Sequence, residues 1–199
     1  IDKADKTSGW ITPSKKDETS LDRYLGVPAY VARTGVFTGG ANAIYWLRIT
    51  EEINHNKVRV MNIVERAKNK VNIVSTEIEK EFIYPFITGS DISFWKFEYS
   101  RYILLPHTKE TKMYPVGEEK LQEFPLTKQY FETFKMDLEA RKGFTSFDRN
   151  IHLQNYYTLQ RIGEYTFQPY KVAWRYIAKE FTPCVIESVD DIYLGLKNS

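Results

Sequence analysis

The chain has 199 residues, 42% hydrophobic and 27% charged, so it can bury a core and is not an intrinsically disordered segment. Its net charge of +2 is weak evidence for a polyanionic partner, and a single cysteine excludes an intrachain disulfide and fits a cytoplasmic location. No apolar stretch approaches the roughly 20 residues that a membrane span needs. Cys184 lies in an apolar run, which favours a buried, inert thiol over a nucleophile.

The first segment of the chain, residues 1–24, is polar and rich in Lys and Asp, which predicts a linker or loosely attached arm. We expect residues 25–199 to form one domain. The chain begins with Ile and not with Met, which indicates a fragment of a longer protein.

Short runs rich in β-branched and aromatic residues, bounded by Gly, Pro, Asn and Asp, predict strands from Ala29 onwards. The predicted strands are Tyr30–Val36, Ala43–Thr50, Lys57–Val64, Val71–Ile78, Tyr102–Leu105, Lys171–Ile177, Cys184–Ser188 and Ile192–Leu196. The charged residues 65–70 between two of these runs predict a turn.

One helix is predicted over Lys128–Lys142, with Thr127 as its N-cap and Gly143 just after its basic end. Its apolar side chains repeat at helical spacing and form one stripe. That stripe consists of Tyr130, Phe131, Phe134 and Leu138. A weaker helical pattern covers His152–Ile162.

Two glycine-bearing runs are the most informative features of the sequence. The first is Arg33–Tyr45, with Gly35, Gly39 and Gly40, and the second is Tyr84–Ile92. Glycines and short polar side chains in a turn let backbone N–H groups approach a ligand closely. We name these turns the first bend (residues 38–42) and the second bend (residues 88–91).

Charge and aromatic content add modest support for a nucleic-acid partner. Nine basic and five acidic residues lie between Lys128 and Lys179. This window therefore has a net charge of +4, and the remainder of the chain has a net charge of −2. Aromatic residues make up 15% of the chain. They are interpreted either as a β-rich core or as a surface that stacks on a ligand.

Several further motifs follow the two bends in a fixed order. They are Phe94-Trp95, Arg101–Pro106 ending in proline, the helical set Tyr130, Phe134, Leu138 and Arg141, the run Tyr156–Arg161, and Pro169–Val172. This ordered set resembles the TaqI-like C-terminal specificity domain, the target-recognition domain of DNA adenine-N6 methyltransferases and of fused type II restriction–modification enzymes. Tyr156 departs from the family, which more often has Trp there.

The resemblance implies an α+β fold with a curved, mostly antiparallel sheet and a few packed helices. It implies sequence-specific recognition of double-stranded DNA beside a methyltransferase domain of the same polypeptide. The cofactor S-adenosylmethionine would belong to that domain, and none is expected in this fragment. It also implies that the C-terminal end of the domain is incomplete at Ser199.

The candidate DNA-contacting residues follow from the bends and the basic window. They are Thr38, Gly39, Asn42, Gly89, Ser90, Arg141, Lys142, Arg149, Arg161 and Lys171. Ordinary turns and a solvated surface are the alternative interpretations. Asp91 is expected to brace the second bend. Strand alternation would place Lys171 and Arg175 on one face, where structural ion pairing is equally compatible with the pattern.

Catalysis is not expected in this fragment, because the sequence contains no Pro-Pro pair and therefore no Asn/Asp-Pro-Pro-aromatic motif. A metal-dependent nuclease using Asp91, Glu110 and Lys112 is a competing interpretation, although Glu-x-Lys patterns arise by chance in a charged chain. The second alternative is a β-rich module that binds sugar or protein through its aromatics.

Overall fold

The computed structural model of the chain describes residues 31–65, 67, 69–142, 144–187 and 195–196. The chain divides into two compact units, residues 1–33 and 34–199. Of the first unit, residues 31–33 are described, and they form neither helix nor strand. The predicted boundary between residues 24 and 25 lies outside the described residues and stays a prediction.

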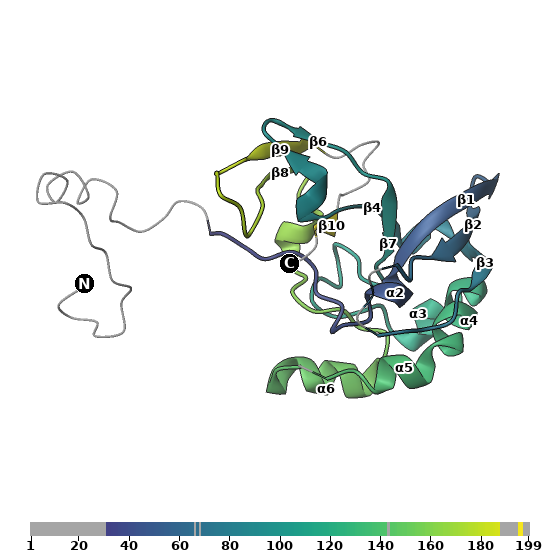
Figure 1. Cartoon of the computed structure of the whole chain (residues 1–199). Coiled ribbons are helices and arrows are strands. Elements are labelled where there is room, and N and C mark those ends of the chain that lie inside the picture. Colours follow the sequence, from purple (N-terminus) through teal and green to yellow (C-terminus); the bar gives the residue numbers. More distant parts are fainter. Residues whose placement is uncertain (1–30, 66, 68, 143, 188–194, 197–199) are drawn as a thin grey trace, which may run out of the picture. The chain divides into compact units, whose positions relative to one another are not determined.

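The second unit is an α+β fold around a six-stranded sheet in the order β10-β4-β7-β1-β2-β3 (Figure 1). Its strands are β1 (Trp46–Asn54), β2 (Lys57–Asn62), β3 (Ser75–Glu79), β4 (Ile83–Ile87), β7 (Arg101–Leu104) and β10 (Gly195–Leu196). The β10–β4 pair is parallel and the other pairs are antiparallel. The expected α+β class with a mostly antiparallel sheet is therefore confirmed.

Two small antiparallel pairs complete the described strands. They are β5 (Ile92–Ser93) with β6 (Lys96–Phe97), and β8 (Tyr170–Ala173) with β9 (Cys184–Glu187). We call them together the twin hairpins. In Figure 1 the labels β6, β8 and β9 lie at the top of the view, and α5 and α6 lie at its bottom.

The described helices are short. They are α2 (Asn42–Tyr45), α3 (Glu118–Leu121), α4 (Pro125–Thr133), α5 (Lys135–Glu139) and α6 (Ser146–Gln154), with 3-10 turns η1 (Lys80–Phe82), η2 (Gly89–Asp91) and η3 (Glu164–Phe167). A carboxylate from β3 holds the start of α4: Glu79 accepts hydrogen bonds from the amides of Leu126 and Thr127 and from the Thr127 hydroxyl, at 2.7–3.0 Å. This contact fixes the helices against the sheet.

Buried aromatic rings fill the space between the sheet and the helices. Phe131 of α4 stacks on Tyr157 at 5.3 Å between ring centroids and tilts against Tyr45 at 6.0 Å. Buried hydroxyls still need acceptors, and backbone carbonyls supply them: Tyr45 donates to Tyr157 O (2.8 Å) and Tyr130 to Ile44 O (2.6 Å). Burial raises the pKa of Tyr45 to about 12, so it stays a neutral donor. Many aromatics are therefore core residues.

The predicted helix over Lys128–Lys142 is wrong in its bounds. The chain forms α4 and α5 instead, interrupted at Phe134, whose φ of −109° and ψ of 16° leave the helical region. Pro125 supplies the first helical residue, where its missing N–H costs nothing, so Thr127 lies inside α4 and not at its cap. The proposed end at Gly143 lies outside the described residues.

The strand predicted over Ala43–Thr50 is wrong in both of its bounds. Residues 42–45 form the helical turn α2, and β1 starts after them and continues to Asn54. Within the predicted strand Tyr30–Val36, residues 31–35 form no strand, and Tyr30 is not described. Val36 and Phe37, which follow them, each lie in an isolated β-bridge, and Phe37 pairs with Gln160. β-propensity is a weak guide where glycines force a tight turn.

Two other strands are shorter than predicted for local reasons. β3 begins at Ser75 because the Asn62 side chain takes the place of a strand partner, accepting from Val74 N (2.7 Å) and donating to Asn72 O (3.0 Å). β8 ends at Ala173, so the alternation assumed for Lys171 and Arg175 does not apply. Of the last predicted strand, residues 195–196 form β10 and the remainder is not described.

The weak helix over His152–Ile162 is wrong in the same way. The helix α6 occupies Ser146–Gln154, and Thr145 caps it by accepting from the amide of Asp148 at 3.2 Å. Beyond it the chain turns and extends, where Gln160 exchanges backbone hydrogen bonds with Phe37 at 2.9 and 3.0 Å. This exchange anchors the chain just before the first bend.

Candidate nucleic-acid interface

The first bend is a tight turn built on two left-handed glycines. Gly39 has φ +65° and Gly40 has φ +89°, a conformation that side chains with a Cβ adopt at a cost. The hydroxyl of Thr38 donates to Oδ1 of Asn42 at 2.6 Å and closes the turn. Thr38 is buried, so its predicted contact with DNA cannot be through an exposed side chain.

Arg141 braces the first bend from the end of α5. Its guanidinium donates to three backbone carbonyls: Thr38 (3.0 Å), Leu138 (3.0 Å) and Tyr156 (2.5 Å). Burial lowers the pKa of Arg141, but a guanidinium in a protein remains charged. Because the side chain is buried and each of its three nitrogens donates to a backbone carbonyl, Arg141 is corrected from a phosphate contact to a positioning residue.

A depression of about 470 Å³ opens beside the first bend. Its lining includes Gly39, Gly40, Asn69, Asp137, Arg141 and Lys142. The fold thereby brings together three of the predicted site residues, Gly39, Arg141 and Lys142, from segments about a hundred positions apart. Of these, Lys142 is exposed.

The second bend is closed by its own carboxylate. Asp91 Oδ2 accepts from the amide (2.8 Å) and the hydroxyl (2.7 Å) of Thr88, and Asp91 Oδ1 pairs with Arg101 at 3.3 Å. The expected bracing role of Asp91 is confirmed. Ser90 is exposed and Gly89 is half-buried, so the apex of this bend is reachable from solvent.

The second bend lies against the twin hairpins. A Cβ built on Gly89 would lie 4.0 Å from Cγ of Arg175, and Arg175 Nε donates to Ile92 O at 2.8 Å. The amide of Trp95 donates to Pro183 O at 3.1 Å and joins one hairpin to the other. The two bends thus have different neighbours, α5 for the first and β8–β9 for the second, and form two separate contact regions.

The remaining predicted cations are spread over other elements. Arg149 is exposed on α6, and Arg161 lies over the Phe37 ring at 5.3 Å and donates to the Thr34 hydroxyl at 3.2 Å. Lys171 donates to Gln168 O at 2.8 Å, and burial lowers its pKa to about 8. Arg149 and Arg161 therefore keep donors toward solvent, whereas Lys171 is partly engaged.

Sequence reasoning missed a group of exposed aromatic side chains on the twin hairpins. We name Phe94, Trp95, Trp174, Tyr176 and Phe181 the aromatic tips. The signal was present in the sequence, because Phe94-Trp95-Lys96 and Trp174-Arg175-Tyr176 alternate rings with cations. Such interleaving is typical of surfaces that bind nucleic acid.

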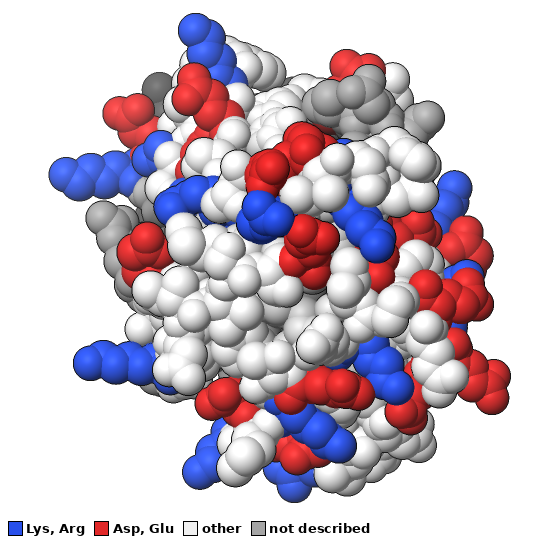
Figure 2. Space-filling model, turned by 90° about the vertical axis from the view of Figure 1, so that its right-hand side faces the viewer, with Lys and Arg blue, Asp and Glu red and all other residues white. Residues whose placement is uncertain are grey.

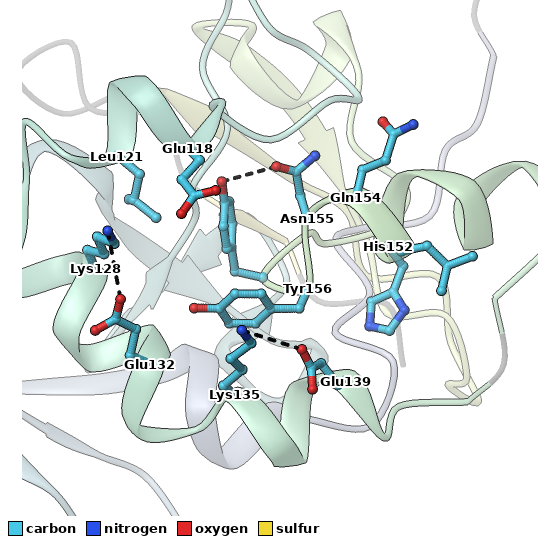
Figure 3. A pocket seen from close by; sticks show the side chains of 12 residues that line it. Glu118, Leu121, Lys128, Glu132, Lys135, Glu139, His152, Gln154, Asn155 and Tyr156 are labelled. Atoms are coloured by element: carbon cyan, nitrogen blue, oxygen red, sulfur yellow. Dashed lines mark hydrogen bonds and ion pairs between the residues drawn. The ribbon is translucent and has the colours of Figure 1, made fainter.

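A second depression, of about 420 Å³, is formed by α3, α4, α5 and the end of α6 (Figure 3). Three carboxylates line it, Glu118, Glu132 and Glu139, and the last two pair with lysines at 3.8 Å. Burial and these carboxylates raise the pKa of Tyr156, at its centre, to about 12. Because lysines pair with two of these carboxylates, the depression offers no surplus of positive charge to a DNA phosphate.

The face that carries β1, β2 and β3 has side chains of both signs around a broad uncharged area (Figure 2). On β1 and its neighbours the charges are paired, with Glu51 and Glu77 contacting Arg59, and Glu52 contacting Lys80. Such interspersed, paired charge gives no single-sign surface for a polyanion.

The residues of the nuclease interpretation have other partners. Asp91 is held within the second bend, and Lys112 pairs with Glu164 at 3.7 Å. Among the described residues no group of three or more His, Cys, Asp or Glu is placed to hold a metal ion. Cys184 is buried, as predicted, and burial raises the pKa of its thiol.

Comparison with known proteins assigns no family: no family model matches the chain, and no curated protein matches it. Within the part of the chain that the structure describes, no helix combines the length and apolar character needed to cross a membrane.

Proposed function

We propose that this chain is the double-stranded DNA recognition module of a DNA adenine-N6 methyltransferase or restriction–modification enzyme, and that it is not catalytic by itself. The observation that carries the proposal is the depression at the first bend, where Gly39, Arg141 and Lys142 meet. Backbone amides next to left-handed glycines form concave anion sites, and a nearby guanidinium charge strengthens the attraction.

Each residue at the first bend has a separate part in this proposal. Arg141 holds the bend in shape and adds positive potential, while exposed Lys142 contacts a phosphate directly. The Asn42 side chain, whose oxygen is occupied by Thr38, keeps its amide hydrogens for an acceptor on a base edge.

The second bend would supply a second contact to the same duplex. Ser90 and Arg175 lie there, and DNA-binding proteins commonly contact the backbone at several places along one helical turn. The α+β fold with a mostly antiparallel sheet is compatible with the specificity-domain class that the motif order resembles. In that setting S-adenosylmethionine and the methyltransferase domain lie in the remainder of the polypeptide.

The proposal is tested by fluorescence anisotropy with random-sequence duplexes at several salt concentrations. Affinity should fall steeply with salt, and Lys142→Ala should lower the slope of log K against log salt by about 1. The matched control is Lys135→Ala. Lys135 lies at the start of α5 and pairs with Glu139 in the second depression, away from the first bend. Absence of binding to every duplex at low salt, or equal slopes for both variants, would overturn the proposal.

A β-rich module that binds sugar or protein is the second candidate, and the exposed aromatic tips favour it. Such a module would bind its ligand without a steep salt dependence. Calorimetric titration with neutral oligosaccharides separates the two candidates. Saturable, salt-independent heat would support the sugar-binding alternative.

A further inference from the structure

Hydrogen bonds to backbone carbonyls join the two loops that carry the aromatic tips and fix these loops relative to each other. The Trp95 amide donates to Pro183 O at 3.1 Å, and Arg175 Nε donates to Ile92 O at 2.8 Å, so each loop is tied to the opposite hairpin. Within the loops, Phe94 contacts Trp95 edge-on at 5.2 Å and Trp174 contacts Phe181 at 5.9 Å. Rings already packed in this way lose little entropy when a ligand stacks on them.

The aromatic tips are exposed to solvent, although burial of these apolar rings in the core would be more favourable. Trp95 is 65% exposed and Phe181 is 68% exposed. Trp95 also adopts φ +63°, a left-handed conformation that is strained for a residue with a Cβ. An exposed tryptophan in a strained turn contributes nothing to the core and points to a binding surface.

Cations alternate with the rings along both loops. Lys96 follows Trp95, Arg175 follows Trp174, and Lys179 lies two positions before Phe181. None of these three forms an ion pair with any described residue, although Glu98 follows β6 and Glu180 is the neighbour of Lys179. Toward the residues that the structure describes, Arg175 uses Nε alone as a donor, which leaves its remaining N–H groups for an anion.

We propose that the aromatic tips form a stacking platform for a DNA base displaced from the duplex, with Lys96, Arg175 and Lys179 on the flanking phosphates. This proposal rests on the proposed function and assigns the tips a ligand within it. A nucleobase offers a flat face for Trp95 and carries a phosphate on either side, which matches the alternation of ring and cation. An apolar protein partner bound to the aromatic tips would leave Lys96, Arg175 and Lys179 without anionic groups to contact.

The experiment compares a perfect duplex with the same duplex carrying one extrahelical 2-aminopurine nucleotide, and both are titrated at the same series of salt concentrations. The chain should bind the bulged duplex about 5- to 100-fold more tightly and quench the 2-aminopurine fluorescence, as expected for stacking on one base. Trp95→Gly, whose new residue suits the left-handed turn, and Phe181→Ala should each lose this preference. Trp95→Phe should keep most of it.

The matched control is Leu153→Ala, which removes an equally exposed apolar side chain on α6 and should change nothing. If the wild-type chain binds both duplexes equally with a steep salt dependence, the stacking platform is wrong and DNA recognition stands. If it binds neither duplex, the proposed function fails first. Loss of the preference in Leu153→Ala as well would also contradict a specific role for the tips.

Discussion

The guanidinium of Arg141 donates a hydrogen bond to the backbone carbonyl of Thr38 at 3.0 Å, across 103 positions of sequence. This contact links the end of α5 to the first bend and determines the shape of the depression between them. Because the same guanidinium also reaches the carbonyls of Leu138 and Tyr156, one buried side chain sets the relative positions of three segments: the first bend, the end of α5 and the chain at Tyr156.

Replacing Arg141 should therefore destabilise the fold. Arg141→Met keeps much of the apolar stem but removes the guanidinium hydrogen bonds to the carbonyls of Thr38, Leu138 and Tyr156, and we expect a loss of about 3 kcal/mol in the free energy of unfolding. Urea denaturation followed by circular dichroism measures it. The neighbouring variant Lys142→Ala should change stability by no more than about 0.5 kcal/mol, because Lys142 is exposed. A small effect of Arg141→Met would contradict the positioning role.

The first bend makes a prediction of its own. Gly39→Ala should cost about 1 kcal/mol, because alanine is strained at φ +65° while its new methyl group would meet Arg141 and Phe144 only at ordinary contact distance, 3.5 Å. Gly117→Ala is the control, since nothing lies within 4 Å of a Cβ there and its φ is −65°. Equal stabilities of the two variants in thermal denaturation would argue against a left-handed Gly39.

Stability should fall in mild acid because of His107. Burial lowers the pKa of His107 to about 4, against about 6.5 in an unfolded chain. Its Nε2 accepts a hydrogen bond from the amide of Leu159 at 3.1 Å. Protonation of Nε2 would therefore place two N–H donors against each other and break this hydrogen bond. The unfolded chain thus binds a proton that the folded chain excludes below pH 6.5, and the stability present at neutral pH is lost progressively as the pH falls toward 4.

The expected loss from this histidine is about 2 kcal/mol between pH 7.5 and pH 5. Urea midpoints across this range measure it. His107→Gln should flatten the pH dependence, because glutamine does not titrate, whereas the exposed His55→Ala should retain it. A wild-type slope in His107→Gln would show that other groups control the acid response.

The anchor between β3 and α4 gives a fourth prediction. Burial alone would raise the pKa of Glu79, but hydrogen bonds from the Thr127 hydroxyl and from the Leu126 and Thr127 amides outweigh it and lower the pKa. Glu79→Ala removes these acceptors from a helix N-terminus and should cost about 1–2 kcal/mol. That contribution is present above the ordinary carboxyl pKa and is lost as the pH falls through the lowered one.

Glu77→Ala on the same strand is the control for Glu79. Glu77 pairs with Arg59 at 2.8 Å in a solvent-accessible ion pair, and such pairs contribute about 0–1 kcal/mol. Chemical denaturation of both variants at neutral pH should rank Glu79→Ala as clearly less stable. The reverse ranking would contradict the anchoring of α4 by Glu79.

Local sequence determined the strand-rich character of the chain, the positions of β2 and β9, the bracing of the second bend by Asp91, and the burial of Cys184. These follow from short-range chemistry: alternation of side chains, turn residues, and a carboxylate within reach of its own turn. Only the tertiary structure decided that Arg141 is buried beneath the first bend, that Thr127 contacts Glu79, and that hydrogen bonds join one of the twin hairpins to the other. Each of these contacts joins residues far apart in sequence, and whether a cation or a ring is buried or exposed depends on which distant segment packs on it.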